Sequence, residues 1–451
     1  MSLSKILDIS SGSLDAYSKA LDVTANNISN SSNPDYSRQT INFQTETPQQ
    51  LAGLIWGSGV KISDINRVRN SLTDSQIRAN NQKFSYSDTS STMLNQIQSL
   101  FSEPSDQGLS NLMSNFFNSW QQLAVTPNST SLRQNVIYAA NQVGDKVKNI
   151  TDGINSIKGD IVSQFNNSVN QINTYLSQIQ GLNAQIFTAQ SSGASPNDLM
   201  DQRDKLIDSL SKLVNINVTT DNNNSANISI GGVLAADRSS YVQFTAAIEN
   251  GALVLKGPDG TSSALTGGSL YALSDIYSNK LPSYQSSLDQ VMQQLVSSVN
   301  AAHSQGSTIT DPPQTGVNFF DNYQSGVLTV NKDILNDPSM IAVSADGTSG
   351  NGDIAVTIGN IADQKVLNGK TISDSYSDLI SKIGNDTSSA KDSATSLQLV
   401  LNQLNQQKAS YSGVSVDEEM TNVIKYQRSY DASAKLIKVA DDMMQTLIDM
   451  V

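Results

Sequence analysis

Both ends of this chain carry apolar residues at intervals of seven, and that spacing restricts the fold more than any other feature of the sequence. A seven-residue repeat returns to one face of an α-helix every two turns, so it predicts a helix that packs lengthwise on another helix. The two stripes are Leu7, Leu14, Leu21 and Ile28 near the start, and Val423, Tyr430, Ile437 and Met444 near the end. We expect the two helices to pair and to complete their burial against other copies of the chain, since ordering a helix needs compensating burial. Two ordinary helices on a globular core are the alternative.

The middle of the chain predicts further long helices. Apolar residues recur every three to four positions in residues 69–101 and 109–125. The clearest seam consists of Phe165, Ile172, Ile179 and Ile186, and it predicts a helix of nearly 30 residues that begins near Ile161. Partner helices are expected around Leu281 to Leu295 and around Leu397 to Tyr411. At about 1.5 Å per residue, such helices build an elongated rod.

Residues 40–68 are predicted to be extended or irregular, with Gly53, Gly57 and Gly59 as turn points. Residues 214–255 and 316–357 break the helical period with short alternating or apolar runs and predict strands. The predicted fold is mainly α with β-rich insertions (α+β): a rod of long coiled-coil-like helices, paired N- and C-terminal helices and a small β outer domain. Residues 1–38 and 412–451 would form a terminal coiled-coil domain. Residues 39–213 and 272–411, including 316–357, would form a helix-rich rod domain, and residues 214–271 a β-rich outer domain.

Composition excludes several classes of function. The 451 residues include no Cys and one His, so Cys/His metal sites and thiol nucleophiles are excluded. A net charge of -13 makes nucleic acid and anionic membranes poor partners, and no apolar run reaches the roughly 18 residues of a membrane span. We expect no catalytic residue, cofactor, metal or membrane insertion, and we expect His303 to be a solvated residue at a helix end.

Three polar motifs favour structural roles. Asn368-Gly369-Lys370-Thr371 lacks the earlier glycine of a phosphate-binding loop, so it predicts a turn. The acidic triplet 417–419 would lie in the first turn of the last helix, with Ser415 as its cap. Arg203 would be an anchor whose planar guanidinium binds two carboxylates and closes a loop on a helix.

Residues 20–30, which include Asn26 and Asn27, and residues 33–39, which include Pro34 and Tyr36, resemble the N-terminal signature of bacterial flagellar rod, hook and hook-associated proteins. Residues 196–206 and 412–420 narrow the resemblance to the family of hook-filament junction proteins, the first hook-associated proteins. The first of these stretches contains Asn197, Asp198, Asp201, Arg203 and Asp204. Asp35 stands where members of the family usually carry Gly.

The resemblance implies a structural protein and no enzyme. It implies export through the flagellar type III channel without a cleaved signal peptide, and an extracellular place at the hook-filament junction. The implied partners are other copies of the chain in a ring, the flagellar hook protein, the next hook-associated protein toward flagellin, and an export chaperone at the C-terminal helix. Alternatives are another axial flagellar protein of the hook or distal rod, a secreted wall hydrolase with paired carboxylates, or an adhesin that binds through residues 214–270.

Overall fold

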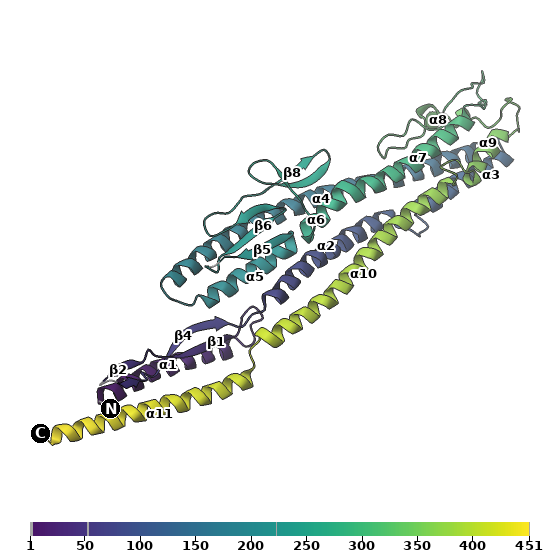
Figure 1. Cartoon of the computed structure of the whole chain (residues 1–451). Coiled ribbons are helices and arrows are strands. Elements are labelled where there is room, and N and C mark those ends of the chain that lie inside the picture. The colour runs from purple at the N-terminus through teal and green to yellow at the C-terminus, as the bar shows by residue number, and fades with distance from the viewer. Residues whose placement is uncertain (1–2, 52–53, 222, 451) are drawn as a thin grey trace.

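The computed structural model describes residues 3–51, 54–221 and 223–450. The molecule is long and narrow, with α1 (Leu3–Ser29) and α11 (Val416–Asp449) side by side at one end and the remaining helices extending away from them (Figure 1). The predicted fold class, an elongated and mainly α rod with paired terminal helices and small sheets, is confirmed.

Long helices form the rod. They are α2 (Ser71–Phe101), α3 (Leu109–Val125), α4 (Thr130–Ser191), α5 (Asn197–Leu213), α6 (Gly268–Asp275), α7 (Leu281–His303) and α10 (Ile372–Ser412). Two short helices, α8 (Lys332–Asn336) and α9 (Asp353–Gly359), lie at the far tip (Figure 1). α10 lies along α2, and α3 lies along α4. The helices predicted in residues 69–101 and 109–125 are confirmed.

The helix predicted to begin near Ile161 is wrong in length. It is the second half of α4, which has 62 residues and at about 1.5 Å per residue extends roughly 93 Å. The first half was not predicted, because glycines in residues 144–159 have low helix propensity. A helix that is buried by its neighbours tolerates them. A heptad of Val136, Val143, Ile150 and Ile157, all buried, is the signal that continues the seam toward the N-terminus.

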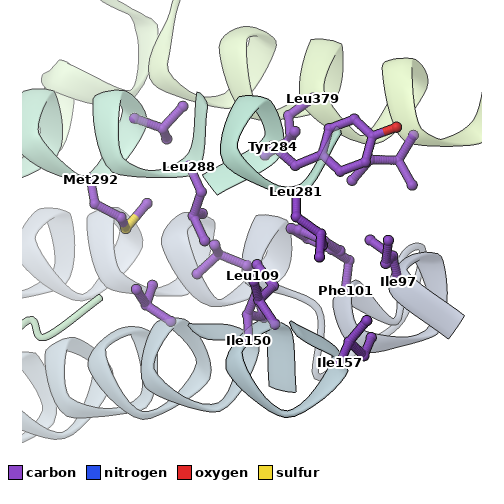
Figure 2. Packing of buried hydrophobic residues seen from close by; sticks show 14 of the residues in the cluster. Ile97, Phe101, Leu109, Ile150, Ile157, Leu281, Tyr284, Leu288, Met292 and Leu379 are labelled. Carbon is purple, nitrogen blue, oxygen red and sulfur yellow. The ribbon is translucent and has the colours of Figure 1, made fainter. Parts of the chain in front are cut away.

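The rod core is built where several helices converge. Figure 2 shows Ile97 and Phe101 of α2, Leu109 of α3, Ile150 and Ile157 of α4, Leu281, Tyr284, Leu288 and Met292 of α7, and Leu379 of α10. All are buried, and large aliphatic and aromatic side chains contribute about 1.5–3 kcal/mol each when fully buried. This packing fixes the rod to which the terminal helices are attached.

The strands form four small antiparallel sheets. β1 (Gln39–Thr45) pairs with β4 (Val60–Arg67), and β2 (Gln49–Leu51) with β3 (Leu54–Trp56), beside α1. β5 (Ile216–Thr220), β6 (Ala226–Ile230) and β7 (Val233–Ala236) form one sheet, and β8 (Thr245–Glu249), β9 (Ala252–Lys256) and β10 (Ser262–Ser263) another. Buried Ile228 and Leu253 of these two sheets belong to the same hydrophobic cluster as α4 and α5.

The strands predicted in residues 316–357 are wrong. The structure has only isolated bridges there, such as Phe320 with Val330, together with α8 and α9. The apolar runs around Leu328 and Val343 are buried in the shared core, and in sequence that burial produces the same short apolar run as a strand. The predicted turn at Asn368-Gly369 is present, with φ of 50° and 78° at those residues.

The solvated position predicted for His303 is also wrong. His303 ends α7, but its ring is buried against Trp120 and Phe319. Nε2 accepts the Ala342 N–H at 2.9 Å, so Nδ1 carries the proton and donates to the Val317 carbonyl at 2.7 Å. Burial lowers the pKa of His303 to about 4, against a smaller opposing effect of the Val317 contact.

Candidate assembly interface

The contact between α1 and α11 is made largely by small side chains. Ala16 and Ala20 of α1 are buried, as are Ser433 and Ala440 of α11, and such residues let two helix backbones approach closely. Beside them Tyr17 of α1, Phe43 of β1 and Tyr426 of α11 form an aromatic cluster with ring centroids 5.8–6.5 Å apart. The terminal pair is therefore a close helix contact with little apolar bulk of its own.

The predicted heptad residues are only partly covered within the single chain. Leu7, Leu14, Leu21 and Ile28 of α1 are half-buried, as are Val423 and Ile437 of α11. Tyr430 and Met444 are exposed, each with 38% of its surface accessible. Every residue of the two predicted stripes thus keeps some accessible surface.

α11 carries a second apolar stripe, which the seven-residue spacing did not predict. Leu436, Val439, Met443 and Leu447 are spaced by three and four residues, and 47–51% of each is exposed. Met420 and Ile424 are exposed nearer the start of the helix. A search for the i, i+3, i+4 pattern would have found this stripe in the sequence. Apolar side chains at this density on one helix are typical of an interaction surface.

Asn27 connects three segments where the terminal pair meets the rod. Its Nδ2 donates to the Gln39 carbonyl at 2.9 Å and to Glu419 Oε2 at 3.1 Å. Its Oδ1 accepts from the Tyr36 hydroxyl at 2.8 Å and the Gln39 N–H at 3.0 Å. Among the described residues, the side chain of the neighbouring Asn26 accepts one hydrogen bond, from Asn30 Nδ2 at 2.7 Å one turn later. Asn27 is 1% exposed, and its hydrogen-bonding capacity is fully used.

The acidic triplet at the start of α11 binds an arginine. Arg38 Nε donates to Glu419 at 2.8 Å, and its Nη2 lies 3.1 Å from Glu418. The predicted cap is wrong in detail, since Ser415 occupies the N-cap position without a side-chain hydrogen bond. Glu419 is buried, so this ion pair fixes the start of α11 to the segment that follows α1.

Carboxylates of α5 bind Ser37, in the segment that follows α1, and the arginines at the end of β4 and just after it. Asp201 accepts from the Ser37 N–H at 2.9 Å, the Ser37 hydroxyl at 2.7 Å and Arg67 at 2.7 Å. Asp204 accepts from Arg67 at 3.0 Å and from Arg69 at 2.6 Å. Burial alone would raise the pKa of Asp204, but the guanidinium groups, that of Arg69 foremost, hold it below its ordinary value. Asp204 is therefore a charged anchor, and Asp201 beside it holds Ser37 and Arg67.

Asn197 and Asp198 at the start of α5 extend the network to β1. Gln39 Nε2 donates to Asp198 at 2.9 Å, and Asn197 Nδ2 donates to Gln39 Oε1 at 3.1 Å. Burial and then the charges of Asp198 and Asp201 raise the pKa of Tyr36 well above its ordinary value. Pro34 is exposed at the rim of a cleft of about 540 Å³ that Lys212 also lines.

Arg203 is an anchor, but its partners differ from those predicted. Among the described residues it donates to Asn183 Oδ1 of α4 at 3.3 Å, to the Asn224 carbonyl and to a single carboxylate, that of Asp204, at 3.4 Å. Arg67 and Arg69, which the sequence analysis did not single out, bind the carboxylates instead. Asp35 has no left-handed backbone in the structure and forms an ion pair with Lys205 at 2.7 Å.

This network holds the terminal pair to the rod, and its buried charges are matched to one another. In the part of the chain that the structure describes, no group of three His, Cys, Asp or Glu side chains is placed to hold a metal ion. Within the same residues, no helix combines the length and apolarity needed to cross a membrane.

Comparison with known proteins gives consistent matches. A family model described as the flagellar hook-associated protein FlgK helical domain matches residues 94–320, and one for the C-terminal part of flagellar basal body rod FlgEFG proteins matches residues 405–450. Flagellar hook-associated protein 1 of Bacillus subtilis is 27% identical and that of Salmonella typhimurium 24%, over 98% and 99% of this chain and 97% and 100% of theirs. The flagellar hook junction protein FlgK of Burkholderia pseudomallei shares the fold, with a TM-score of 0.65 and 17% identity over 74% of this chain and 99% of that one.

Proposed function

Because the chain belongs to the family of flagellar hook-associated protein FlgK, we propose that it is the structural junction between the hook and the filament of a bacterial flagellum. The observation that carries its mode of assembly is the incomplete cover of the terminal helices. α11 exposes Leu436, Val439, Met443 and Leu447, a surface that neighbouring subunits would bury. A hook or distal-rod role is not favoured, because the helical-domain match is to the hook-associated family.

We further propose which partners the chain contacts and where it assembles. Copies of the chain form a ring outside the cell after type III export, with the hook protein on one side and the next hook-associated protein on the other. Within each subunit, residues 1–38 and 412–451 form the assembly domain, residues 39–213 and 272–411 the rod, and residues 214–271 an outer domain. The sequence resemblance and the exposed terminal helices support this arrangement.

Deleting the gene tests the function. We expect cells that keep their hooks but carry no filaments and release flagellin into the medium, and a plasmid copy should restore filaments. Loss of the hook itself would point instead to a hook or distal-rod protein. Filaments that form normally would overturn the junction function, and adhesion or wall-lysis assays on the purified chain would then test the remaining classes.

The export chaperone is proposed to hold the C-terminal helix before assembly. Exposed apolar side chains on α11 would otherwise associate in the cytoplasm. A chain that lacks residues 430–451 should lose binding to the purified chaperone, while a chain that lacks residues 3–14 should keep it. Equal binding by both truncated chains would contradict this assignment.

A further inference from the structure

We propose that the outer sheets (β5 to β10) and the terminal pair of helices are energetically coupled through one line of buried polar side chains. Loosening either end should therefore loosen the other, since a coupling free energy acts in both directions. The coupling is a property of the single chain and does not depend on the proposed function. The polar line consists of Asn183, Arg203, Asp204, Arg67, Asp201 and Ser37.

The outer end of the polar line is Asn183 of α4. Its Nδ2 donates to the Ala226 carbonyl at 2.9 Å and to the Asp237 carbonyl at 3.3 Å, and its Oδ1 accepts the Ala226 N–H at 3.0 Å. One amide thus pairs with both backbone groups of the first residue of β6, as a neighbouring strand would. The same Oδ1 accepts from Arg203 at 3.3 Å, and Arg203 also donates to the Asn224 carbonyl just before β6. Side chains of both α4 and α5 therefore fix the start of β6.

One turn of α5 carries the polar line across that helix. Asp201 and Arg203 project about 200° apart around the helix axis, and Asp204 lies between them. Arg203 Nη2 lies 3.4 Å from Asp204. Arg67 Nη1 bridges the two carboxylates, at 3.0 Å from Asp204 and 2.7 Å from Asp201. The turn therefore joins a contact of the outer sheets on one side of α5 to β4 on the other.

The inner end of the polar line reaches both terminal helices. Asp201 accepts from the Ser37 N–H at 2.9 Å and from the Ser37 hydroxyl at 2.7 Å. The next residue, Arg38, donates to Glu419 of α11 at 2.8 Å, and Asn27 of α1 donates to the same carboxylate at 3.1 Å. A shift of Ser37 is therefore passed to the start of α11 and to α1.

Burial makes these contacts depend on one another. Asn183, Arg203 and the two α5 carboxylates are each less than a tenth exposed, so water cannot replace a lost partner. Networks of this kind contribute more than the sum of their separate pairs. Arg203 Nε is buried without a hydrogen-bond partner among the described residues, so the contacts of the other two nitrogens set the position of this guanidinium.

Two asparagines of α4 provide a matched test on the purified chain. Asn173 pairs with both backbone groups of Phe244 at 2.8 Å, as Asn183 does with those of Ala226, but none of its hydrogen bonds among the described residues involves the polar line. Sites that share no partner usually act independently. Asn183→Ala should speed amide hydrogen exchange of residues 416–424 by at least about fivefold, whereas Asn173→Ala should speed exchange around Phe244 and leave 416–424 as in wild type.

Hydrogen exchange with mass spectrometry resolves these segments. Wild-type exchange of residues 416–424 in Asn183→Ala, or equal acceleration of that segment by Asn173→Ala, would overturn the proposal. Neither result bears on the junction function, which the gene deletion tests separately.

The reverse direction excludes a general loss of structure in the outer sheets. Asn27→Ala acts on the terminal pair and should speed exchange of β6 by a similar factor, because the coupling is reciprocal. Arg203→Met removes every donor of the guanidinium and interrupts the polar line, so adding Asn27→Ala to it should change β6 no further. Unchanged exchange of β6 in Asn27→Ala, or the same acceleration by Asn27→Ala with and without Arg203, would contradict the coupling.

Discussion

At the scale of single residues, Asn27 has more influence than its size suggests, because it joins α1, the segment before β1 and the start of α11. Asn27→Ala would leave the Tyr36 hydroxyl, the Gln39 N–H and an oxygen of Glu419 without this partner. We expect the opening free energy of α1, measured by amide hydrogen exchange, to fall by roughly 2–4 kcal/mol. Asn26→Ala, which loses a local contact with Asn30, should change it by less than about 1 kcal/mol. Equal effects of the two substitutions would contradict the role of Asn27.

His303 makes the far tip of the rod sensitive to acid. Its folded pKa of about 4 lies below the ordinary value of 6.5, so the neutral ring contributes stability that is complete above about pH 6.5 and is lost as the pH falls toward 4. Protonated Nε2 can no longer accept the Ala342 N–H, and the charge of Arg133 also opposes protonation. The contribution reaches roughly 3 kcal/mol.

Thermal unfolding between pH 7 and pH 4.5 checks this prediction. His303→Gln should be less stable than wild type at pH 7, and its unfolding temperature should fall less steeply with acid. Parallel pH curves for the two proteins would exclude His303 as the source of the acid sensitivity.

These two residues also show what a sequence can and cannot reveal. Asn27 lies in a recognisable signature, yet one of its partners, Glu419, is 392 residues away, and no local pattern encodes that contact. His303 sits in a polar stretch at a helix end, where solvent exposure is the ordinary outcome. Its burial depends on Phe319 and Ala342, which reach it only through the folding of the tip.

At the scale of elements, periodic apolar residues predicted the helices well wherever packing follows a single stripe. The predicted range 109–125 equals that of α3, and the stretch 214–255, predicted to hold strands, contains β5 to β8 and most of β9. The pattern failed in residues 316–357, where buried apolar residues belong to irregular chain, and at α4, where glycines concealed a continuous helix. An apolar pattern indicates which residues are buried, but it does not indicate which other element covers them.

Two glycines of α4 distinguish packing from helix propensity. A Cβ at Gly144 would lie too close to the Leu328 carbonyl oxygen, whereas a Cβ at Gly159 would meet nothing within 4 Å. Gly159→Ala should stabilise the chain by about 0.5–1 kcal/mol. Gly144→Ala should destabilise it by roughly 1–3 kcal/mol, because the loop around Leu328 must shift. Urea unfolding measures both, and equal stabilisation by the two substitutions would show that the loop does not pack tightly on α4.

At the scale of the whole molecule, stability should decline from the rod toward the terminal pair. Only Glu419, Ser433 and Ala440 are buried along the described length of α11, whereas α4 buries a continuous stripe. In dilute solution we expect amides near Leu14 and Ile437 to exchange at least about a hundredfold faster than those near Ile172, because few contacts oppose local opening. Hydrogen exchange with mass spectrometry resolves the three regions. Protection at Leu14 and Ile437 equal to that at Ile172 would mean that the lone subunit already completes its terminal helices.

The hydrophobic cluster is drawn out along the molecule, from the sheets beside α4 to the helices at the tip, and is nowhere gathered into one ball (Figure 1). Each part of the cluster is packed by side chains from neighbouring elements. A substitution that disturbs the packing of one part therefore leaves the packing of distant parts unchanged. Changes in the loops at the far tip can therefore be accommodated without altering the packing of the terminal pair of helices.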